Sequence, residues 1–372
     1  MSDADGARGH WGATLEIDLD AVAANWAMLA ARVKPAQCAA VVKANGYGLG
    51  AVAVAKRLYA EGARLFFVAH LDEALALRPH LPKARLAVLN GLAAGGLGEH
   101  VAADIAAVLN RPEDVALWAD AAARAGRMLP AFLHIDTGMN RLGIGIEQAR
   151  ALAADNSWRR SIELVAVMSH LVASEEQANP INQEQLARFR PLRAAFAQYP
   201  ASLANSSAIF LGSDYYFDIA RPGAALYGIN PTPGKANPMR AVARLDAKIL
   251  QVRRVDTPQS VGYGATWRAK KPSSIATLAV GYADGYLRSS GNRGWAAIDG
   301  QRIPIVGRVS MDLITIDVTE IAEGRARPGA LVELIGPTLP VDDVADRAAT
   351  NGYEIFTSLG PRYRRVYRGA AA

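Results

Sequence analysis

Two different hydrophobic patterns divide the chain near residue 238. Before that point, short apolar runs alternate with longer segments whose apolar residues recur at helical spacing. The longer segments predict helices, one beginning at Asp18 or Asp20 and others over residues 50–61, 72–80, 112–126, 147–156 and 182–199. The short runs predict eight strands, over residues 38–43, 65–70, 85–89, 106–109, 130–136, 164–170, 201–205 and 217–221. This alternation favours a (β/α)8 barrel. An open doubly wound sheet is the second choice, because the GxGxxG motif typical of such sheets does not follow the first strand.

The pattern changes after about Met239, where apolar and polar residues alternate with a period of two. Residues 245–252 and 314–318 follow this pattern, and Asp299-Gly300 predicts the turn of a hairpin between them. The proline- and glycine-containing segment 230–238 interrupts both patterns and indicates a linker. We therefore predict two domains, a (β/α)8 TIM barrel over residues 12–238 and a mostly-β domain over residues 239–372.

Composition narrows the functional classes. The chain has 372 residues, of which 51% are hydrophobic, so it can fill a sizeable core. Its net charge, 41 − 35 = +6, suits small anionic ligands without forming the basic stripe of a nucleic-acid-binding protein. Cys38 is the single cysteine, which rules out an intrachain disulfide, and the six histidines lack the spacing of metal ligands. We expect no metal site.

The sequence also bears on localisation. No apolar run reaches the roughly 18 residues needed to cross a bilayer, and the polar N-terminus lacks the apolar core of a signal peptide. We therefore expect a cytoplasmic protein with no membrane partner, and a mobile tail up to about His10.

Lys43 is the first candidate for chemistry. It ends a predicted buried strand and begins the glycine-rich turn ANGYGLG, after which helical spacing resumes. A lysine desolvated by apolar neighbours loses part of its preference for the ammonium form, and its amine can then form a Schiff base. The alternative is a solvated lysine that merely ends a strand.

Polar residues follow several of the other predicted strands. Because active sites of such barrels lie at the carboxyl ends of the strands, these residues should gather at one mouth. They are His134, Asp136 and Arg141 after the fifth strand, Ser169 and His170 after the sixth, Asn205, Ser206 and Ser207 after the seventh, and Arg221, Gly223 and Ala224 after the eighth. The hydroxyls and backbone N–H groups at the last two strands suit a phosphate. Together with Lys43 they predict a phosphorylated aldehyde cofactor, although Asn205 and Ser206 could be a plain helix N-cap.

These residues carry a family resemblance. VVKANGYGLG resembles the pyridoxal-phosphate attachment signature of alanine racemases, the fold-type III pyridoxal-phosphate enzymes. Further similar motifs follow in the family's order, namely HIDTGMNRLG, MSHL, ANSSA, ARPGAALYGINP, VGYGATW, VGYADGY and GRVSMDLITIDVT. So many independent motifs over nearly the whole chain favour a site role for Lys43.

The resemblance implies the cofactor contacts. Lys43 would hold pyridoxal 5'-phosphate as a Schiff base and then act as the base on one face of the substrate Cα. The phosphate would contact Tyr47, Asn205, Ser206, the backbone at Gly223 and Ala224, and a C-terminal tyrosine, for which Tyr363 is the candidate. Arg221 would face the pyridine nitrogen and, being able only to donate, leave that nitrogen unprotonated. His170 would support Arg221, although a structural salt bridge and an ordinary buried histidine are the alternative interpretations of these two residues.

It also implies the substrate contacts. Tyr263 would be the base on the opposite face, supplied by the second domain of a partner subunit in a homodimer with shared active sites. Arg141 and the backbone N–H of Met311 would hold the substrate carboxylate. Tyr282 and Met311 would narrow the pocket towards an alanine-sized side chain, and Asp312 would organise its entrance.

The sequence departs from the family pattern in two places. Many relatives carry a carbamylated lysine where this chain has His134, and imidazole cannot supply that carboxylate to Arg141. In LGPRYRR the expected phosphate-binding tyrosine is displaced, and Tyr363 is the candidate in this segment.

The function implied is alanine racemisation by two-base proton transfer, supplying D-alanine for peptidoglycan or using it in catabolism. The alternatives are a broad-specificity amino-acid racemase or a decarboxylase of the same cofactor fold, and a non-catalytic cofactor carrier. A carrier would need neither Tyr263 nor a second domain.

Overall fold

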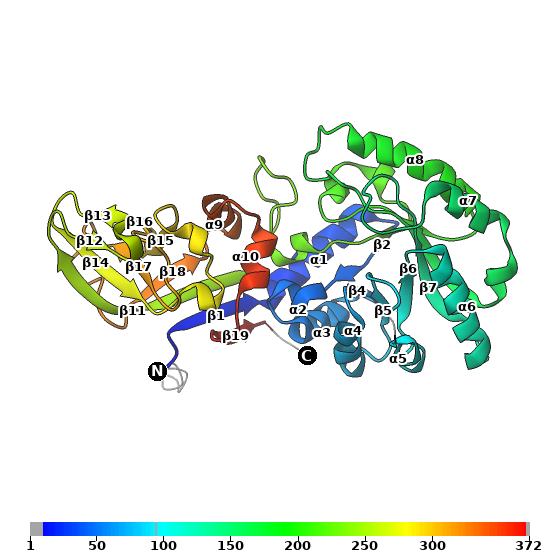
Figure 1. Ribbon diagram of the computed structural model, residues 1–372, viewed down its shortest axis with the longest axis horizontal. Helices are drawn as coiled ribbons and strands as arrows, with labels where there is room; N and C mark the ends of the chain where they lie inside the picture. The colour runs from blue at the N-terminus through cyan, green and yellow to red at the C-terminus, as the bar shows by residue number, and fades with distance from the viewer. Residues whose placement is uncertain (1–9, 94, 370–372) are drawn as a thin grey trace. The chain divides into compact units, whose positions relative to one another are not determined.

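The computed structural model describes residues 10–93 and 95–369, and residues 1–9 of the expected mobile tail lie outside the described residues. The chain forms two compact units. One comprises Asp20–Arg240, and the other combines residues 10–19 with Ala241–Gly369. Figure 1 shows helices and strands alternating in the first unit and strands dominating the second.

The first unit is an α/β barrel built on a curled parallel sheet. Seven strands pair in the order β3-β4-β5-β6-β7-β8-β9, and β10 pairs with β2. Backbone hydrogen bonds from Asp218 to Ala201 (3.0 Å) and from Val41 to Pro222 (3.0 Å) connect β10 to the two edges of the sheet. The strands are β2 (Gln37–Cys38), β3 (Ala40–Val41), β4 (Leu65–Val68), β5 (Arg85–Val88), β6 (Ala106–Leu109), β7 (Leu129–His134), β8 (Ile162–Met168), β9 (Ala201–Ser202) and β10 (Ile219–Ala220).

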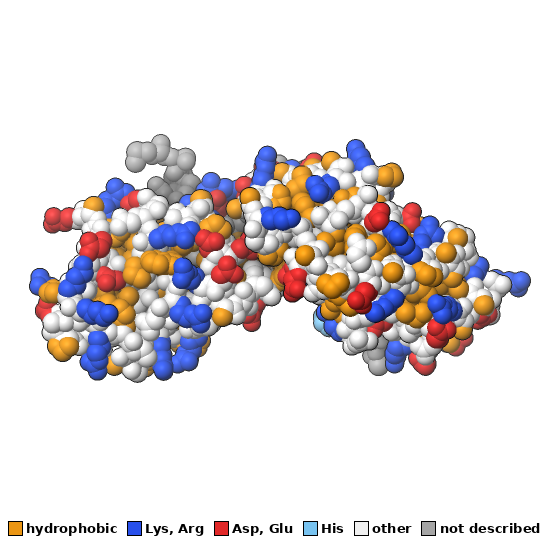
Figure 2. Space-filling view, turned by 90° about the horizontal axis from the view of Figure 1, so that it is seen from above, with side chains coloured by type: hydrophobic (Ala, Val, Ile, Leu, Met, Phe, Trp, Pro, Cys, Tyr) orange, Lys and Arg blue, Asp and Glu red, His pale blue; other side chains and the backbone are white. Residues whose placement is uncertain are grey.

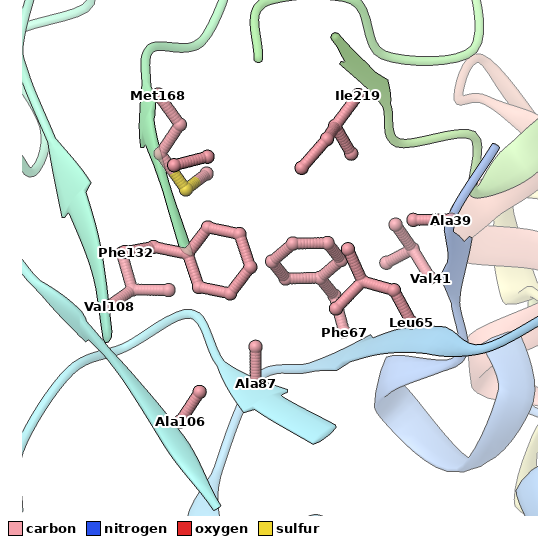
Figure 3. Close-up of a cluster of buried hydrophobic side chains, with 11 residues drawn as sticks. Ala39, Val41, Leu65, Phe67, Ala87, Ala106, Val108, Phe132, Met168 and Ile219 are labelled. Atoms are coloured by element: carbon pink, nitrogen blue, oxygen red, sulfur yellow. The ribbon is translucent and has the colours of Figure 1, made fainter. Parts of the chain in front are cut away.

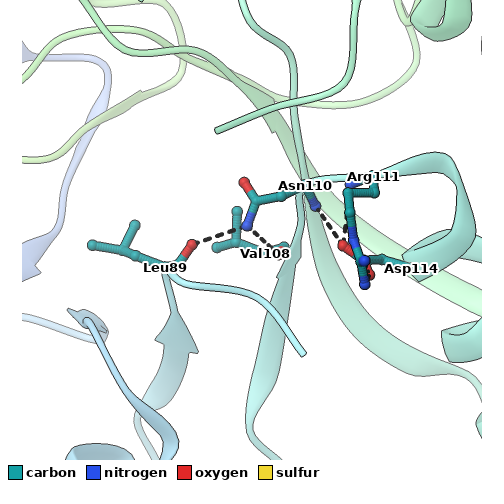
Figure 4. Close-up of polar contacts among 5 residues, drawn as sticks. All are labelled: Leu89, Val108, Asn110, Arg111 and Asp114. Atoms are coloured by element: carbon teal, nitrogen blue, oxygen red, sulfur yellow. Dashed lines mark hydrogen bonds and ion pairs between the residues drawn. The ribbon is translucent and has the colours of Figure 1, made fainter. Parts of the chain in front are cut away.

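Helix α1 precedes the first strand of this unit, and the other helices connect its successive strands. They are α1 (Leu19–Val33), α2 (Lys43–Tyr47), α3 (Ala51–Glu61), α4 (Leu71–Leu77), α5 (Leu97–Ala102), α6 (Pro112–Ala125), α7 (Ile146–Ala154) and α8 (Ile181–Ala195). At the start of α6 the carboxylate of Asp114 forms a capping contact typical of such connections, because it accepts the N–H groups of Asn110 and Arg111, both at 3.1 Å (Figure 4). Short strands joined by helices explain the alternating pattern of the sequence, and the predicted barrel is confirmed.

Side chains fill the interior of the barrel, as Figure 3 shows. The rings of Phe67 and Phe132 lie 5.1 Å apart between centroids, and both are fully buried. Smaller side chains from neighbouring strands surround them, among them Ala39, Val41, Leu65, Ala87, Ala106, Val108, Ala166, Met168 and Ile219. The interior is therefore packed, and the polar residues that follow the strands are left at its mouth.

The second unit is a β-rich domain. Its main sheet has the order β16-β15-β18-β11-β1-β19, with β14 paired to β11 and β17. The strands are β1 (Ala13–Asp18), β11 (Ala243–Val255), β12 (Ser260–Val261), β13 (Trp267–Arg268), β14 (Ser273–Leu278), β15 (Trp295–Ile298), β16 (Gln301–Pro304), β17 (Ile314–Asp317), β18 (Leu331–Ile335) and β19 (Arg364–Arg368), with helices α9 (Val341–Ala348) and α10 (Gly352–Ser358). The predicted hairpin is present, since Ile298 pairs with Gln301 across Asp299 and Gly300.

Strand β1 was not predicted. Residues from 12 onwards were predicted to belong to the barrel, but β1 pairs antiparallel with β11 and parallel with β19. Predicted barrel strands also extended further than the observed ones, because the chain leaves strand geometry once its polar residues reach the mouth. The observed β9 covers two residues, and the strand predicted through Lys43 ends at Val41.

The surface carries mixed charge. On the face drawn in Figure 2, lysines and arginines are interspersed with aspartates and glutamates. Across residues 10–93 and 95–369, no helix combines the length and apolarity needed to span a membrane. The same described residues contain no group of His, Cys, Asp and Glu that could hold a metal ion.

Candidate active site

Lys43 opens a left-handed turn rather than ending a strand. The three residues after it have positive φ and ψ, with φ of 52°, 53° and 62° for Ala44, Asn45 and Gly46, and Tyr47 also has a positive φ of 52°. Each L-residue in this conformation costs about 1–2 kcal/mol, so surrounding contacts must stabilise the turn. Within it, the N–H of Gly46 donates to the carbonyl of Val42 at 2.9 Å.

Side chains also hold this turn. The N–H of Ala51 donates to Oδ1 of Asn45 at 3.0 Å. From the next βα connection, Glu73 accepts the N–H of Asn45 at 3.4 Å and, through its other oxygen, those of Ala69 at 2.8 Å and His70 at 3.2 Å. Glu73 therefore ties the lysine turn to the start of α4.

The surroundings of Lys43 favour its neutral amine. Burial is the main cause that lowers its pKa from the usual value, and the positive charge of Arg141 lowers it further. The carboxylate of Glu73 acts in the opposite direction. The net effect makes the Lys43 amine a better nucleophile than an exposed lysine.

Hydrogen-bond donors suited to an anion lie just after β9 and β10, and we call this group of residues the Ser206 pocket. The hydroxyl oxygen of Ser206 accepts the N–H groups of Gly223 at 2.9 Å and Ala225 at 3.2 Å. With its lone pairs occupied, this hydroxyl has its proton free to donate outwards. Oδ1 of Asn205 accepts the N–H of Ala208 at 2.9 Å, which is the capping contact that the sequence left open, and its Nδ2 can still donate. Ala224 begins the short 3-10 helix Ala224–Tyr227 beside them.

Tyr47 packs against this pocket. Its ring stacks on that of Tyr227 with centroids 4.6 Å apart, and the Tyr227 hydroxyl donates to the carbonyl of Val41 at 3.2 Å. A Cβ built on Gly223 would overlap the Tyr47 hydroxyl. The lysine turn and the Ser206 pocket are therefore in direct contact.

Arg221 is a buried cation whose hydrogen-bond partners within residues 10–93 and 95–369 are all neutral. Its guanidinium donates to the hydroxyl of Ser202 and to the carbonyl of Ser169, the latter at 2.7 Å. Burial lowers its pKa to about 10, so it remains protonated near neutral pH. Among the ion pairs of the described residues none involves Arg221, so the structural salt bridge considered as an alternative is not observed there.

The Thr137–Ser169–Gln185 network supports this region. The hydroxyls of Thr137 and Ser169 lie 2.7 Å apart, and Nε2 of Gln185 donates to Thr137 at 3.2 Å and to the carbonyl of His170 at 3.0 Å. Burial and the charge of Arg221 lower the pKa of His170 to about 3, so its imidazole is neutral. The two side chains lie close enough for the charge of Arg221 to act on His170, and support of Arg221 by His170 stays a prediction.

Arg141 belongs to the same group of charges, because it lowers the pKa of Lys43, His134 and His170. Its guanidinium makes no hydrogen bond or ion pair with the residues that the structure describes. Asp136 does not hold it, since its carboxylate accepts the backbone N–H groups of Gly138 and Met139 at 2.8 Å and Asn140 at 2.9 Å. Asp136 instead shapes the loop that presents Arg141.

The remaining predicted site residues lie in the β-rich unit. Tyr263 stands between Gly262 and Gly264, which have φ of 77° and 73°, and it is 72% exposed. Backbone hydrogen bonds from Tyr282 to Ser310 (3.0 Å) and from Ala283 to Met311 (2.9 Å) join the loops that carry Tyr282 and Met311. Both of these side chains are exposed.

Asp312 and Tyr363 lie in this unit too. Arg362 donates to Asp312 at 2.8 Å and to Asp284 at 2.6 Å, and Asp284 also accepts the N–H of Gly281 at 2.8 Å. Asp312 is therefore fixed by an ion pair next to Met311. Tyr363 is buried, and its hydroxyl has no hydrogen-bond partner among the described residues.

Comparison with known proteins agrees with this geometry. The family model "Alanine racemase, N-terminal domain" matches residues 17–231, and "Alanine racemase, C-terminal domain" matches residues 242–367. The chain belongs to the alanine racemase family. An alanine racemase of Rhodospirillum rubrum is 53% identical over 96% of each chain, and a catabolic alanine racemase of Mesorhizobium japonicum is 50% identical over 96% of this chain and 94% of its own.

Solved structures of the alanine racemase family have the same fold. The crystal structure of an alanine racemase from Bartonella henselae with covalently bound pyridoxal phosphate superposes with a TM-score of 0.92. It is 39% identical and covers 96% of this chain and 99% of that one. A biosynthetic alanine racemase from Pseudomonas aeruginosa superposes with a TM-score of 0.90 at 33% identity, covering 96% of this chain and 100% of its own. The predicted fold class and family are confirmed.

Three residues that hold the proposed site residues of this alanine racemase family member were not predicted from its sequence. They are Glu73, which holds the lysine turn, Asn110, whose Oδ1 lies 2.7 Å from Nδ1 of His134, and Arg362, which holds Asp312. Only Asn110 carried a usable signal, since it directly follows a predicted strand as the other site residues do.

Proposed function

We propose that this chain racemises alanine, interconverting the L and D forms with pyridoxal 5'-phosphate held at Lys43. The observation that carries the proposal is the position of Lys43, a partly buried amine whose pKa is lowered by burial and by Arg141. Tyr47, from the same turn, lies against Gly223, whose N–H donates to Ser206. Membership in the alanine racemase family indicates which reaction this arrangement supports.

The residues present fit the cofactor. Lys43 offers an amine for the aldehyde, and the Ser206 hydroxyl and the Asn205 amide offer donors for the phosphate. Gly223 leaves the space that any side chain would fill. Arg221, whose described hydrogen-bond partners are neutral, can donate to the pyridine nitrogen. Lys43, Arg141 and Arg221 concentrate positive charge that suits an anionic phosphate and a carboxylate.

When bound, pyridoxal 5'-phosphate supplies an electron sink that acidifies the C–H bond at the substrate Cα. Once the substrate amine takes its place on the cofactor, Lys43 Nζ is a free amine and would exchange a proton with one face of this carbon, while Tyr263 Oη would exchange a proton with the other. One group removes a proton while the other delivers one, so the substrate keeps its composition and inverts its configuration. Two opposed bases therefore account for racemisation in both directions.

Arg141 binds the substrate carboxylate in this proposal. Its guanidinium has five N–H donors, which suit a bidentate contact with a carboxylate. Tyr282 and Met311 restrict the space next to Cα, so that a methyl side chain is favoured over longer ones. Asp312, held by Arg362, fixes the position of the Met311 loop.

The test of the proton-transfer roles uses two variants. Lys43→Ala should abolish racemisation in both directions, whereas Tyr263→Phe should slow removal of the α-proton from L-alanine more than from D-alanine. The exchange of the α-proton for deuterium can be monitored by NMR, separately for L-alanine and D-alanine. Its rates measure the effects of both variants. Small and equal effects of Tyr263→Phe on the two enantiomers would remove Tyr263 from its role.

We also propose that the working unit is a homodimer in which Tyr263 of one copy serves Lys43 of the other. A mixture of inactive Lys43→Ala and Tyr263→Phe chains, unfolded and refolded together, tests this directly. Half of the dimers would then hold one intact site, so about a quarter of the wild-type activity should return. No recovery in a mixture that forms mixed dimers would contradict the shared site.

A further inference from the structure

A cavity lies at the amino ends of the barrel strands, away from the mouth that carries Lys43. Its volume is about 620 Å³, within the range of small-molecule sites. Gln37, Leu65 and Arg85, the first residues of β2, β4 and β5, all line it. Leu65 also belongs to the packed interior of the barrel, which closes the cavity on its inner side. Because parallel strands carry their active-site residues at their carboxyl ends, this cavity is separate from the proposed site.

Positive charge dominates the lining of this cavity. Of the described residues, four basic side chains and a single carboxylate line it, namely Arg64, Arg78, Lys83, Arg85 and Asp104. The Asp104 carboxylate is already paired with Arg127 at 3.0 Å, and Arg85 is paired with Glu163 at 2.8 Å. The other three positive charges have no carboxylate partner within residues 10–93 and 95–369. The cavity therefore holds an excess of positive charge that a bound anion would balance.

Arg78 holds the rim of the cavity in place. Its Nη1 donates to the carbonyls of Leu81 at 3.0 Å and Ala84 at 2.8 Å, in the loop before β5. Its Nη2 donates to the carbonyl of Asp104 at 3.0 Å, in the loop before β6. Neutral carbonyls orient the guanidinium and leave its charge uncompensated. Since Arg78 joins the two loops before any ligand arrives, little ordering is needed on binding.

Arg64 and Lys83 offer free donors at the same cavity. Only Nη1 of Arg64 is engaged, donating to the carbonyls of Tyr59 at 2.7 Å and Ala63 at 2.9 Å, in and just after the last turn of α3. Its Nε and Nη2 make no hydrogen bond with the part of the chain that the structure describes, and neither does the ammonium group of Lys83. Both side chains are exposed. Capping of α3 therefore accounts for one nitrogen of Arg64 and does not account for Lys83.

We propose that this cavity binds a small free anion that carries two or more phosphate groups. A phosphate group carries a charge of about −1.5 to −2 near pH 7, so two of them match the three uncompensated cations. Guanidinium groups suit phosphate oxygens because their N–H donors are arranged in pairs. None of the described residues that line the cavity is aromatic, so a ring in the ligand has no stacking partner and the phosphates supply the recognition.

Calorimetric titration with inorganic pyrophosphate tests the proposal. The protein is used with pyridoxal 5'-phosphate bound and no free cofactor in solution, so that the phosphate donors of the Ser206 pocket are occupied. We expect one saturable site per chain, whose affinity falls as NaCl is added, because salt screens the attraction between the anion and the cavity. The absorbance of the cofactor should stay constant. Absence of saturable binding, or a change in that absorbance, would overturn the proposal, whereas a protein that binds pyrophosphate here and does not racemise alanine would contradict the proposed function alone.

Lys83→Ala removes one cation from the cavity. It breaks no hydrogen bond or ion pair within the described residues, so the fold should be unaffected. The affinity for pyrophosphate should fall about tenfold, as expected for losing a hydrogen bond between charged groups. Lys56→Ala is the matched control, because Lys56 is an exposed lysine of α3 that does not line the cavity. Equal affinities of the two variants would overturn the proposal.

Asp104→Asn should instead strengthen binding, a result that loss of folding cannot mimic. It removes the carboxylate from the lining and frees Arg127, and asparagine tolerates the positive φ of 51° at this position. The affinity for pyrophosphate should rise roughly threefold to tenfold. Asp214→Asn is the matched control, because Asp214 pairs with Arg190 at 2.7 Å in a similarly exposed ion pair that does not line the cavity. A gain in affinity that is absent from Asp104→Asn, or equal in both variants, would overturn the proposal.

Discussion

The hydroxyl of Tyr47 occupies the space that a side chain at Gly223 would need. A Cβ built on Gly223 would overlap this oxygen and lie 3.0 Å from Cζ of the same ring. Tyr47 cannot easily withdraw, because its ring stacks on the buried ring of Tyr227. The lysine turn and the phosphate pocket therefore fit together only while residue 223 is glycine.

Gly223→Ala should consequently weaken cofactor binding. The added methyl group must displace Tyr47, and overpacking of this kind costs about 1–3 kcal/mol, equivalent to roughly a fivefold to 150-fold loss of affinity. Titration of the apoprotein with pyridoxal 5'-phosphate, followed by absorbance, measures it. Gly98→Ala is the control, since Gly98 lies within α5 and nothing stands within 4 Å of its added Cβ. That variant should gain about 0.5–1 kcal/mol of stability and bind the cofactor normally.

Lys43 should destabilise the apoprotein. Its pKa is lowered by burial and by Arg141, so folding disfavours its charged form. We expect Lys43→Met to raise the Tm of the apoprotein near neutral pH. The advantage should shrink as the pH rises through the lowered pKa, since the wild-type amine is then neutral in the folded state. Calorimetry of both apoproteins measures this, with the exposed Lys56 as control; an equal gain from Lys56→Met would refute the explanation.

Two neutral histidines at the barrel mouth make stability depend on pH. The pKa values of His134 and His170 are lowered to about 4 and about 3. The unfolded chain binds protons near pH 6.5 and the folded chain does not, so stability is lost as the pH falls below about 6.5. Each histidine should contribute a slope of about 1.4 kcal/mol per pH unit between pH 6 and the folded pKa.

Urea unfolding at a series of pH values measures that slope. His134→Gln should reduce this slope by about 1.4 kcal/mol per pH unit, the contribution of one proton. His80→Gln, at an exposed position, should leave the slope unchanged. Identical slopes for wild type and His134→Gln would mean that His134 is already protonated in the folded protein.

Local patterns predicted the fold well where the decisive interactions are local. Asp299 and Gly300 have φ of 50° and 82°, as a tight hairpin turn requires, and their sequence alone indicated it. Strand β1 could not be predicted in this way. Its partners β11 and β19 lie more than 200 residues away, and only their pairing places residues 13–18 in the β-rich unit.

The site residues likewise fall into two groups, those that a local motif identifies and those whose role depends on distant neighbours. Lys43 and Arg221 stand in motifs that a family resemblance identifies, and both lie at the barrel mouth. Glu73 and Asn110 occupy a helix cap and a strand end, which are ordinary positions, and their roles arise from neighbours 28 and 24 residues away. Even the conformation of Lys43 was predicted incorrectly, because a left-handed turn stabilised by Glu73 has no periodic signature.

Arg362 offers a prediction for the β-rich unit. It joins Asp284 and Asp312, and Asp284 in turn accepts the N–H of Gly281, so one guanidinium connects the loops before Tyr282 and after Met311. Arg362→Gln should loosen both loops and raise the KM for alanine several-fold. Cofactor affinity should change little, because Lys43, Ser206 and Arg221 belong to the barrel.

Steady-state kinetics and cofactor titration of Arg362→Gln separate these effects. Arg302→Gln is a matched control, since Arg302 is similarly half exposed and pairs with Asp343 at 2.8 Å, away from both loops. It should lower the Tm without changing KM. If the two variants change KM equally, the Arg362 ion pairs stabilise the domain in general and do not position the substrate loops.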